Sequence, residues 1–224
     1  RAVVDTDPRA ARLRGFGTTV FAEMSALAAS TGAVNLGQGF PDTDGPPEVL
    51  EAAVAAIRDG ANQYPPGDGI PSLRRAIAEH QRRFYGLDLD PDSEVLVTTG
   101  ATEAIAAALL GLLDPGDEVV VFEPMFDTYA AGVAMAGAVV VPVLLAPDAE
   151  GRFRFDPEEL TAAVGPRTRV ILLNTPHNPT GKVLTADEMD HLAETARRHD
   201  LIVVTDEVYE HLVFPGHRHV PMAT

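Results

Sequence analysis

The sequence contains no cysteine among its 224 residues. Disulfide bonds and thiolate metal sites are therefore excluded, and we expect a reducing compartment, the cytoplasm. Positive charge is also scarce, because 17 basic residues stand against 33 acidic ones, for a net charge of −16 without any basic block. We expect no nucleic-acid partner and no anionic membrane partner, and small molecules are the better candidates.

Long hydrophobic runs are missing too. The most apolar stretch, residues 133–147, is too short to span a bilayer and is interrupted by Gly137 and Pro142. The N-terminus shows no apolar signal core, so no membrane association is expected. The composition, with 46% hydrophobic and 22% charged residues, is that of a folded globular protein with a full core.

Apolar, β-branched segments alternate with segments of helix length over most of the chain. Strands are predicted at residues 94–99, 118–124, 138–145, 168–176 and 201–207. Helices are predicted at residues 19–29, 47–59, 70–84, 101–113, 127–135, 156–164 and 185–199. This alternation indicates a three-layer α/β/α architecture with a mostly parallel sheet. Ligands bind such sheets beyond the carboxyl ends of the strands, so the residues there are the first candidates for a site.

The segment Gly100-Ala101-Thr102 lies between a predicted strand and a predicted helix. The glycine permits a tight turn, and the free N–H groups of a helix start can hold a phosphate. The same residues are also explained if Thr102 and Glu103 simply cap the helix.

Aromatic side chains follow the next predicted strand, in the sequence EPMFDTY. Phe126 and Tyr129 could offer a flat face to a ring, although aromatic residues near a sheet edge more often belong to the core.

The loop NTPHNPTGK, residues 174–182, is more specific. Its prolines fix an extended path that presents Asn174 and Asn178 as amide donors, although an ordinary proline turn remains an alternative. We interpret His177 as a polar loop residue, because no second metal ligand or catalytic partner lies at suitable spacing nearby.

The segment LIVVTDEVYEHLVF, residues 201–214, ends an apolar strand with carboxylates. A buried, unpaired Asp206 would be costly, so a cationic partner is expected, either a ligand or an arginine in a structural ion pair.

Together, GATEA, EPMFDTY, NTPHNPTGK and TDEVYEHLVF, in this order, resemble aminotransferases of class I/II, which use pyridoxal 5′-phosphate (PLP) and have fold type I. Upstream, NLGQGFPD and NQYPPGDGIPSLRRAIA are similar to the branch of kynurenine, glutamine, methionine and N-succinyldiaminopimelate transaminases. The overall likeness is greatest to the actinobacterial succinyldiaminopimelate transaminases. The resemblance implies an N-terminal segment, residues 1–46, that belongs partly to a small domain and partly to a linker. It also implies an incomplete PLP-binding large domain, residues 47–224.

The resemblance implies roles for individual residues. Asp206 would pair with the pyridine nitrogen, Tyr209 and Asn178 with the ring hydroxyl oxygen, and Phe126 would stack on the ring. The implied cofactor-binding residues are Gly100, Ala101, Thr102, Phe126, Asn174, Asn178, Asp206, Tyr209 and, from a neighbouring subunit, Tyr64. Gly37 and Asn178 would contact the substrate carboxylate, and the site would require a homodimer. Glu207 is interpreted as structural.

The sequence departs from the family in one respect, because it contains no lysine at the position that forms a Schiff base with the cofactor. The only lysine in the sequence, Lys182, belongs to the NPTGK turn, which is not the Schiff-base position of the family. The arginine that binds the substrate α-carboxylate is missing as well. We therefore expect these residues to be part of a longer transaminase that lacks its C-terminal part here, rather than a catalytically incompetent PLP-binding fragment.

The resemblance implies a function in amino-acid metabolism. The reaction would be a ping-pong transamination between an amino acid and a 2-oxoacid, through a pyridoxamine phosphate form. The residues that would take part in the catalytic step are Asp206, Tyr209 and Asn178. A carbon–sulfur β-lyase could use the same site. A sensor domain of a transcription regulator would need a DNA-binding module and a basic face, and a Rossmann dehydrogenase would need a G-x-G-x-x-G motif, which does not follow the first predicted strand.

Overall fold

The computed structural model describes residues 7–37, 39 and 41–224. Residues 38 and 40 of the NLGQGFPD motif and the N-terminal residues 1–6 lie outside the described part. The helices are η1 (Ala11–Leu13), α1 (Val20–Thr31), α2 (Pro47–Arg58), α3 (Pro71–Tyr85), α4 (Gly100–Leu112), α5 (Asp127–Ala136), α6 (Pro157–Ala163) and α7 (Ala186–His199). The strands are β1 (Glu118–Glu123), β2 (Val139–Leu144), β3 (Ala146–Pro147), β4 (Phe153–Arg154), β5 (Thr168–Asn174) and β6 (Ile202–Asp206).

The main sheet of the described residues has the order β2-β1-β5-β6, and all its neighbouring strands are parallel. The chain proceeds from β1 to β2 on one side and then returns to place β5 on the other side of β1. The direction of winding therefore reverses between β1 and β5, which is where open α/β sheets bind ligands. A short antiparallel pair, β3 and β4, lies outside this sheet and was not predicted from the sequence.

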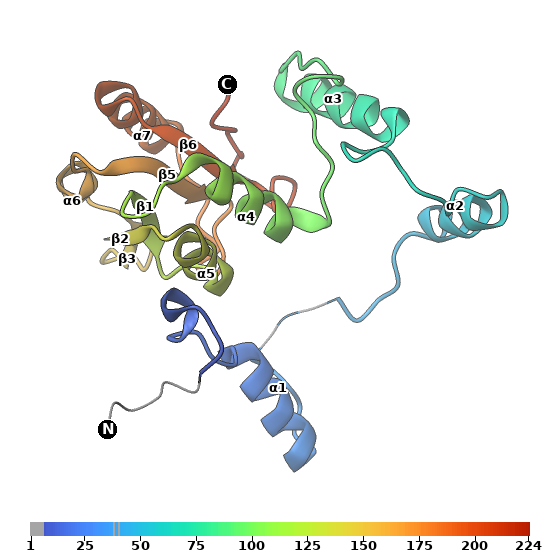
Figure 1. Ribbon diagram of the computed structural model, residues 1–224, viewed down its shortest axis with the longest axis horizontal. Helices are drawn as coiled ribbons and strands as arrows, with labels where there is room; N and C mark the ends of the chain where they lie inside the picture. Colours follow the sequence, from blue (N-terminus) through green and yellow to red (C-terminus); the bar gives the residue numbers. More distant parts are fainter. Residues whose placement is uncertain (1–6, 38, 40) are drawn as a thin grey trace.

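Helices lie over both faces of the sheet (Figure 1), and each face packs against them through a separate hydrophobic cluster. Alternate side chains of β1 belong to opposite faces: Val119 and Val121 pack with α4 and α5, whereas Val120 and Phe122 pack with α6 and α7. The period of two residues in a strand produces this division, and each fully buried Val or Leu side chain contributes roughly 1.5–3 kcal/mol. The predicted three-layer α/β/α fold is confirmed.

The helix ends carry the chemistry that stops and starts helices. Thr185 caps α7, and together with Glu188 it forms a capping box in which each side chain accepts from the other residue's backbone N–H. Gly86 and Gly137 end α3 and α5 in the left-handed conformation, with φ of 72° and 78°. All seven predicted helices are present within a few residues of their expected bounds.

The predicted strand at residues 94–99 is wrong, because this segment forms no strand in the described structure. A strand needs a neighbour to accept and donate its backbone hydrogen bonds, and no strand among residues 7–37, 39 and 41–224 pairs with this segment. Its Val97 N–H donates instead to the Asp68 carbonyl at 3.1 Å, in the loop before α3. Hydrophobic periodicity alone could not reveal the missing neighbour.

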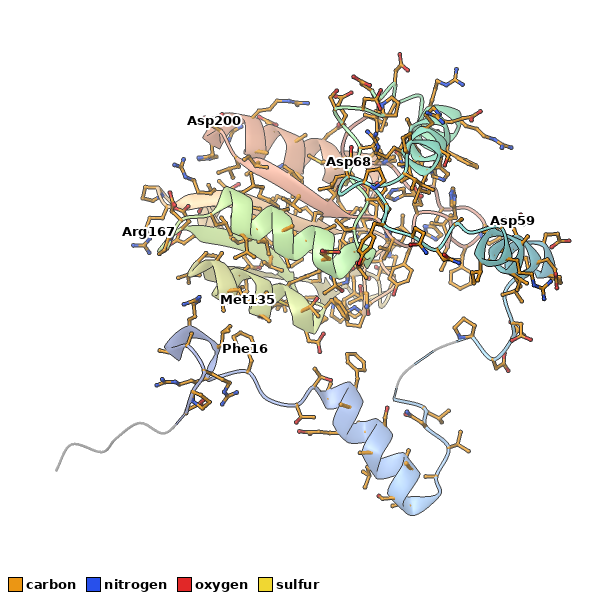
Figure 2. All side chains as sticks on the ribbon, turned by 45° about the vertical axis from the view of Figure 1, so that its right-hand side comes forward. Phe16, Asp59, Asp68, Met135, Arg167 and Asp200 are labelled. Carbon is orange, nitrogen blue, oxygen red and sulfur yellow. The ribbon has the colours of Figure 1, made fainter. Side chains whose placement is uncertain are left out.

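The N-terminal helices stand apart from the sheet (Figure 1). Neither α1 nor α2 contains a buried residue. The short helix η1 contacts the sheet domain through one hydrogen bond, in which Arg12 Nε donates to the Met135 carbonyl of α5 at 3.1 Å. Figure 2 labels Met135 on α5 and Phe16 on the N-terminal segment that faces it. The proposed boundary near residue 46 stays a prediction.

No helix in the described part of the chain has the length and apolar character that crossing a membrane requires.

Candidate functional site

A cavity of about 170 Å³ lies at the carboxyl ends of β5 and β6, beside the start of α4. It is lined by Ala101, Thr102, Ile105, Phe126, Tyr129, Asn174, Asn178, Asp206, Val208 and Tyr209. Seven of the residues predicted from the sequence meet there although they come from four separate segments. Gly100, the eighth, begins α4 directly before Ala101.

Asp206 is the last residue of β6 and is only 8% exposed. Its Oδ2 accepts a hydrogen bond from the Tyr129 hydroxyl at 2.7 Å, and its Oδ1 accepts one from the Val208 N–H at 3.3 Å. No arginine, lysine or histidine of the described residues forms an ion pair with it. The alternative of a structural ion pair with an arginine is therefore not borne out within residues 7–37, 39 and 41–224, and the carboxylate faces the cavity with neutral partners only.

Asn174, at the end of β5, is hydrogen-bonded to two other residues that line the cavity, Asp206 and Asn178. Its Nδ2 donates to the backbone carbonyl of Asp206 at 2.9 Å, and its Oδ1 accepts from the backbone N–H of Asn178 at 2.7 Å. The side-chain amide of Asn174 thus fixes the end of β6 and the 174–182 loop relative to each other. Asn174 and Asn178 both line the cavity, and their separate roles toward a cofactor stay a prediction.

The start of α4 contributes backbone N–H groups. Gly100 adopts φ of 80°, and Thr99 at the N-cap position accepts no backbone hydrogen bond through its side chain. The Glu103 carboxylate instead folds back to accept the Thr99 N–H. Because the first N–H groups of a helix have no partner within the helix, those of Ala101 and Thr102 are available to an anion. Helix capping by Glu103 therefore leaves the N–H groups of Ala101 and Thr102 unoccupied, and their use by an anion stays a prediction.

The two aromatic residues after β1 differ in their surroundings. Tyr129 is almost fully buried, and burial together with the hydrogen bond to Asp206 raises its pKa, so it stays protonated and donates. Phe126 packs edge-on against Tyr129, with ring centroids 5.8 Å apart, and also lines the cavity. The core interpretation of these rings is confirmed by their packing in the cluster beneath α4 and α5, and the binding interpretation stays a prediction.

Tyr129 is the site residue whose role was missed. Its hydroxyl contacts the carboxylate of Asp206, 77 residues further along the chain. The only signal in the sequence is its position three residues after Phe126, one helical turn away, which cannot reveal a partner on another strand.

Two residues predicted for the site, and two that were not assigned to it, lie away from this cavity. Tyr64 is 99% exposed, and the Gly37 N–H donates to Asn35 Oδ1 at 3.0 Å, so this chain alone brings neither to the cavity. Lys182 forms an ion pair with Glu188 at 2.8 Å. Glu207 accepts from His219 Nε2 at 2.8 Å on the other side of β6, as expected for a structural residue.

His177 is buried, and its Nδ1 lies 2.8 Å from Thr180 Oγ1. Burial lowers its pKa to about 4, with the nearby Lys182 charge acting in the same direction. This agrees with the interpretation of a loop histidine.

A larger hollow of about 550 Å³ adjoins the cavity and shares Asn178 and Tyr209 with it. The other residues around it come from the β3–β4 turn, the 174–182 loop and the segment after β6, including Leu212 and Phe214. A molecule in this hollow can therefore reach the same two polar side chains that line the smaller cavity.

The parallel four-stranded sheet with helices on both faces matches the large domain of PLP-dependent transferases of fold type I. The family model for aminotransferase class I and II matches residues 31–223. The chain belongs to this family, whose members normally use PLP.

Individual relatives agree with the family assignment. The chain is 61% identical over 212 residues to the probable N-succinyldiaminopimelate aminotransferase DapC of Mycobacterium tuberculosis. This match covers 95% of this chain and 53% of that protein. It is 44% identical over 208 residues to the methionine aminotransferase of Escherichia coli, covering 93% and 53%. The solved structure of the M. tuberculosis N-succinyldiaminopimelate aminotransferase superposes with a TM-score of 0.93 at 60% identity, over 96% of this chain and 56% of that one. The chain thus spans about half the length of these relatives.

Proposed function

We propose that the complete protein catalyses PLP-dependent transamination between an amino acid and a 2-oxoacid. The observation that carries this proposal is Asp206, a buried carboxylate that faces a cavity at the sheet's switch point without a cationic partner among the described residues. A protonated pyridine nitrogen is a cation of suitable shape for such a carboxylate. When bound, PLP supplies an electron-accepting ring that stabilises the negative charge left when a substrate Cα–H bond breaks.

The residues of the cavity fit the other parts of the cofactor. The first N–H groups of α4, at Ala101 and Thr102, would hold the phosphate. Phe126 would lie against the flat ring, and Tyr209 with Asn178 would hydrogen-bond the ring hydroxyl oxygen. Tyr129 would keep the Asp206 carboxylate oriented toward the ring nitrogen through its 2.7 Å hydrogen bond.

Substrate contacts and the second subunit are part of the same proposal. Asn178 and the Gly37 N–H would bind the substrate α-carboxylate, and Tyr64 would reach the phosphate of a neighbouring subunit in a homodimer. The 99% exposure of Tyr64 supports this, because a fully exposed tyrosine is free to contact another chain. Lys182 is not proposed as the lysine that bonds the cofactor, because its ammonium is held by Glu188.

The 61% identity with a probable N-succinyldiaminopimelate aminotransferase makes N-succinyldiaminopimelate the first amino donor to test. The 44% identity with a methionine aminotransferase makes methionine the second. Release of pyruvate from a cysteine conjugate would instead indicate a carbon–sulfur β-lyase.

The decisive experiment compares Asp206→Asn with Glu207→Gln in the full-length protein. Asp206→Asn removes the charge that keeps the ring nitrogen protonated, and we expect it to slow α-proton abstraction by about 100-fold or more in single-turnover spectroscopy. Glu207→Gln alters the adjacent carboxylate on the other side of the strand and is expected to change the rate only a few-fold. Equal rates for wild type and Asp206→Asn would refute the role of Asp206.

A companion variant, Tyr129→Phe, keeps the carboxylate and removes its hydroxyl donor. A rate between those of wild type and Asp206→Asn is the expected result. A rate equal to that of wild type would mean that the Tyr129 hydrogen bond serves stability and not the reaction.

A further inference from the structure

Three side chains that commonly bind metals meet outside the cofactor cavity. His80 lies in α3, whereas Glu210 and His211 lie in the turn after β6, about 130 residues further along the chain. His80 Nε2 lies 2.9 Å from His211 Nε2 and 3.5 Å from Glu210 Oε1, and His211 Nε2 lies 3.7 Å from the same carboxylate oxygen. Among the described residues this is the one group of histidines and carboxylates whose ligand atoms converge so closely.

Packing of rings around the group holds α3 against the turn. Phe84, one helical turn after His80, packs on both histidines, with ring centroids 4.7 Å from His80 and 4.7 Å from His211. The two imidazoles themselves meet edge to face at 5.1 Å. The histidine nitrogens therefore converge because aromatic contacts fix both rings, and not only because they share a hydrogen bond.

The carboxylate of the group is also held in place. The Tyr85 hydroxyl of α3 donates a hydrogen bond to the Glu210 carboxylate. Such a donor orients a metal-binding carboxylate. On the far side of His80, the side-chain amide of Gln81 lies 3.4 Å from Nδ1. The oxygen of this amide, which a half-turn exchanges with its nitrogen, can accept the Nδ1–H and leave Nε2 free to bind an ion.

The spacing of the three ligand atoms matches a tetrahedral ion. Zinc bonds of roughly 2.0–2.2 Å to nitrogen and oxygen imply separations of about 3.3–3.5 Å between ligand atoms. The two distances to Glu210, 3.5 and 3.7 Å, differ from this by about 0.2 Å or less, and the pair of histidine nitrogens at 2.9 Å would have to separate by about 0.4 Å. The exposed side chain of His211 leaves a fourth position open to water.

We propose that His80, His211 and Glu210 bind a divalent transition-metal ion of the zinc type. Two imidazole nitrogens and one carboxylate oxygen form a ligand set that such ions prefer over magnesium or calcium, which favour all-oxygen sites. Tyr209, which lines the cofactor cavity, directly precedes Glu210 in the chain. A bound ion joins α3 to this turn and restrains the segment that carries Tyr209, without taking part in the reaction.

The test uses untagged full-length protein, because a histidine tag would bind the same ions. After treatment with a chelator and its removal, ZnCl2 is titrated by calorimetry, and CoCl2 is added in a parallel sample to record the visible absorption bands of the bound ion. We expect one ion per chain with a Kd in the micromolar range or below, and cobalt bands of the intensity typical of tetrahedral sites. His80→Ala, His211→Ala and Glu210→Gln should each weaken binding at least tenfold.

Two further variants separate loss of a ligand from loss of structure. His199→Ala removes an exposed histidine at the end of α7 and should bind zinc like wild type. His80→Cys replaces one zinc ligand by another, and residues 1–224 contain no cysteine of their own, so it should retain zinc and add absorption in the thiolate charge-transfer region that the cobalt spectrum of wild type lacks. Absence of zinc binding by wild type below about 100 μM, or unchanged binding in the three ligand variants, would overturn the proposal.

Discussion

Asp206 shows how a buried carboxylate is maintained without a cation. Burying an ion costs several kcal/mol unless hydrogen bonds replace its hydration. Here the Tyr129 hydroxyl and the Val208 N–H donate to the two carboxylate oxygens, and Asn174 fixes the backbone of the same residue. Two neutral donors leave part of the cost uncompensated, which is the physical reason for expecting a cationic ligand in the cavity.

His177 provides a residue-scale prediction about pH. Burial lowers its pKa to about 4, whereas the unfolded chain takes up this proton near pH 6.5. As the pH falls from 6.5 to 4, the unfolded state binds a proton that the folded state does not, so folding stability decreases; it is restored as the pH rises again. The lost stability amounts to about 3 kcal/mol.

The variant His177→Asn removes this titration. In wild type, the free energy of unfolding measured with urea should fall between pH 7 and pH 4.5. In His177→Asn this fall should be smaller by about 2–3 kcal/mol. Thr180→Ala is the matched control, since it removes the partner of Nδ1 but keeps the imidazole and should lower stability similarly at both pH values. An identical pH dependence in wild type and His177→Asn would contradict the prediction.

At the scale of elements, the loop before α3 and the segment before α4 approach each other very closely. Gly69 has φ of 100°, and a Cβ atom at this position would lie 2.4 Å from Val97 Cγ2. The same contact brings the Val97 N–H to the Asp68 carbonyl. Only glycine satisfies both the backbone conformation and the available space, and the contact guides the chain into the start of α4.

Replacing Gly69 by alanine should therefore lower the free energy of unfolding by about 1–3 kcal/mol. Gly67→Ala is the matched control two residues earlier, because a Cβ there meets nothing within 4 Å, and its effect should stay within about 0.5 kcal/mol. Adding Val97→Gly, which removes both the Cγ2 atom at 2.4 Å and the Cβ atom at 2.6 Å, to Gly69→Ala should recover part of the loss, as chemical denaturation of the two single variants and the double variant can measure. Additive losses would show that the overlap with Val97 is not the cause.

At the scale of the whole molecule, the N-terminal helices expose apolar side chains that α/β domains normally bury. In α1, Val20, Met24 and Leu27 are exposed, and in α2, Val49 and Ile57 are exposed. These residues recur at helical spacing, so each helix presents an apolar side to solvent in this chain. Apolar surfaces of this kind mark interaction sites, and the proposed homodimer is one partner that would cover them.

Mixing of two inactive variants tests the proposed homodimer. If Tyr64 acts on the neighbouring subunit while Asp206 acts within its own, a dimer of one Tyr64→Phe chain and one Asp206→Asn chain contains one intact site. Random mixing of equal amounts should then restore about a quarter of wild-type turnover, because half of the dimers are mixed and half of their sites are intact. Turnover no higher than the mean of the two separate variants would show that Tyr64 does not act across subunits.

Much of the fold could be predicted because its local signals agree with its tertiary structure. The period-two pattern of β1 and β5 and the capping residues of α7 specify their elements locally, and each element has the neighbours it needs. The segment 94–99 has the same apolar pattern but lacks a neighbouring strand, so its prediction failed. The cavity-lining positions after β1, β5 and β6 were predictable because parallel strands place their carboxyl ends at one edge.

Periodicity and residue types at short spacings were sufficient to predict the three-layer architecture, the order of the motifs and the family that they resemble. The tertiary structure was needed to show which side chains meet across long separations. It paired the Tyr129 hydroxyl with Asp206, set Gly69 against Val97 and brought His80 to Glu210 and His211. Such contacts depend on the packing of whole elements, and no local pattern in the chain encodes the distance between residues that are 77 or 131 positions apart.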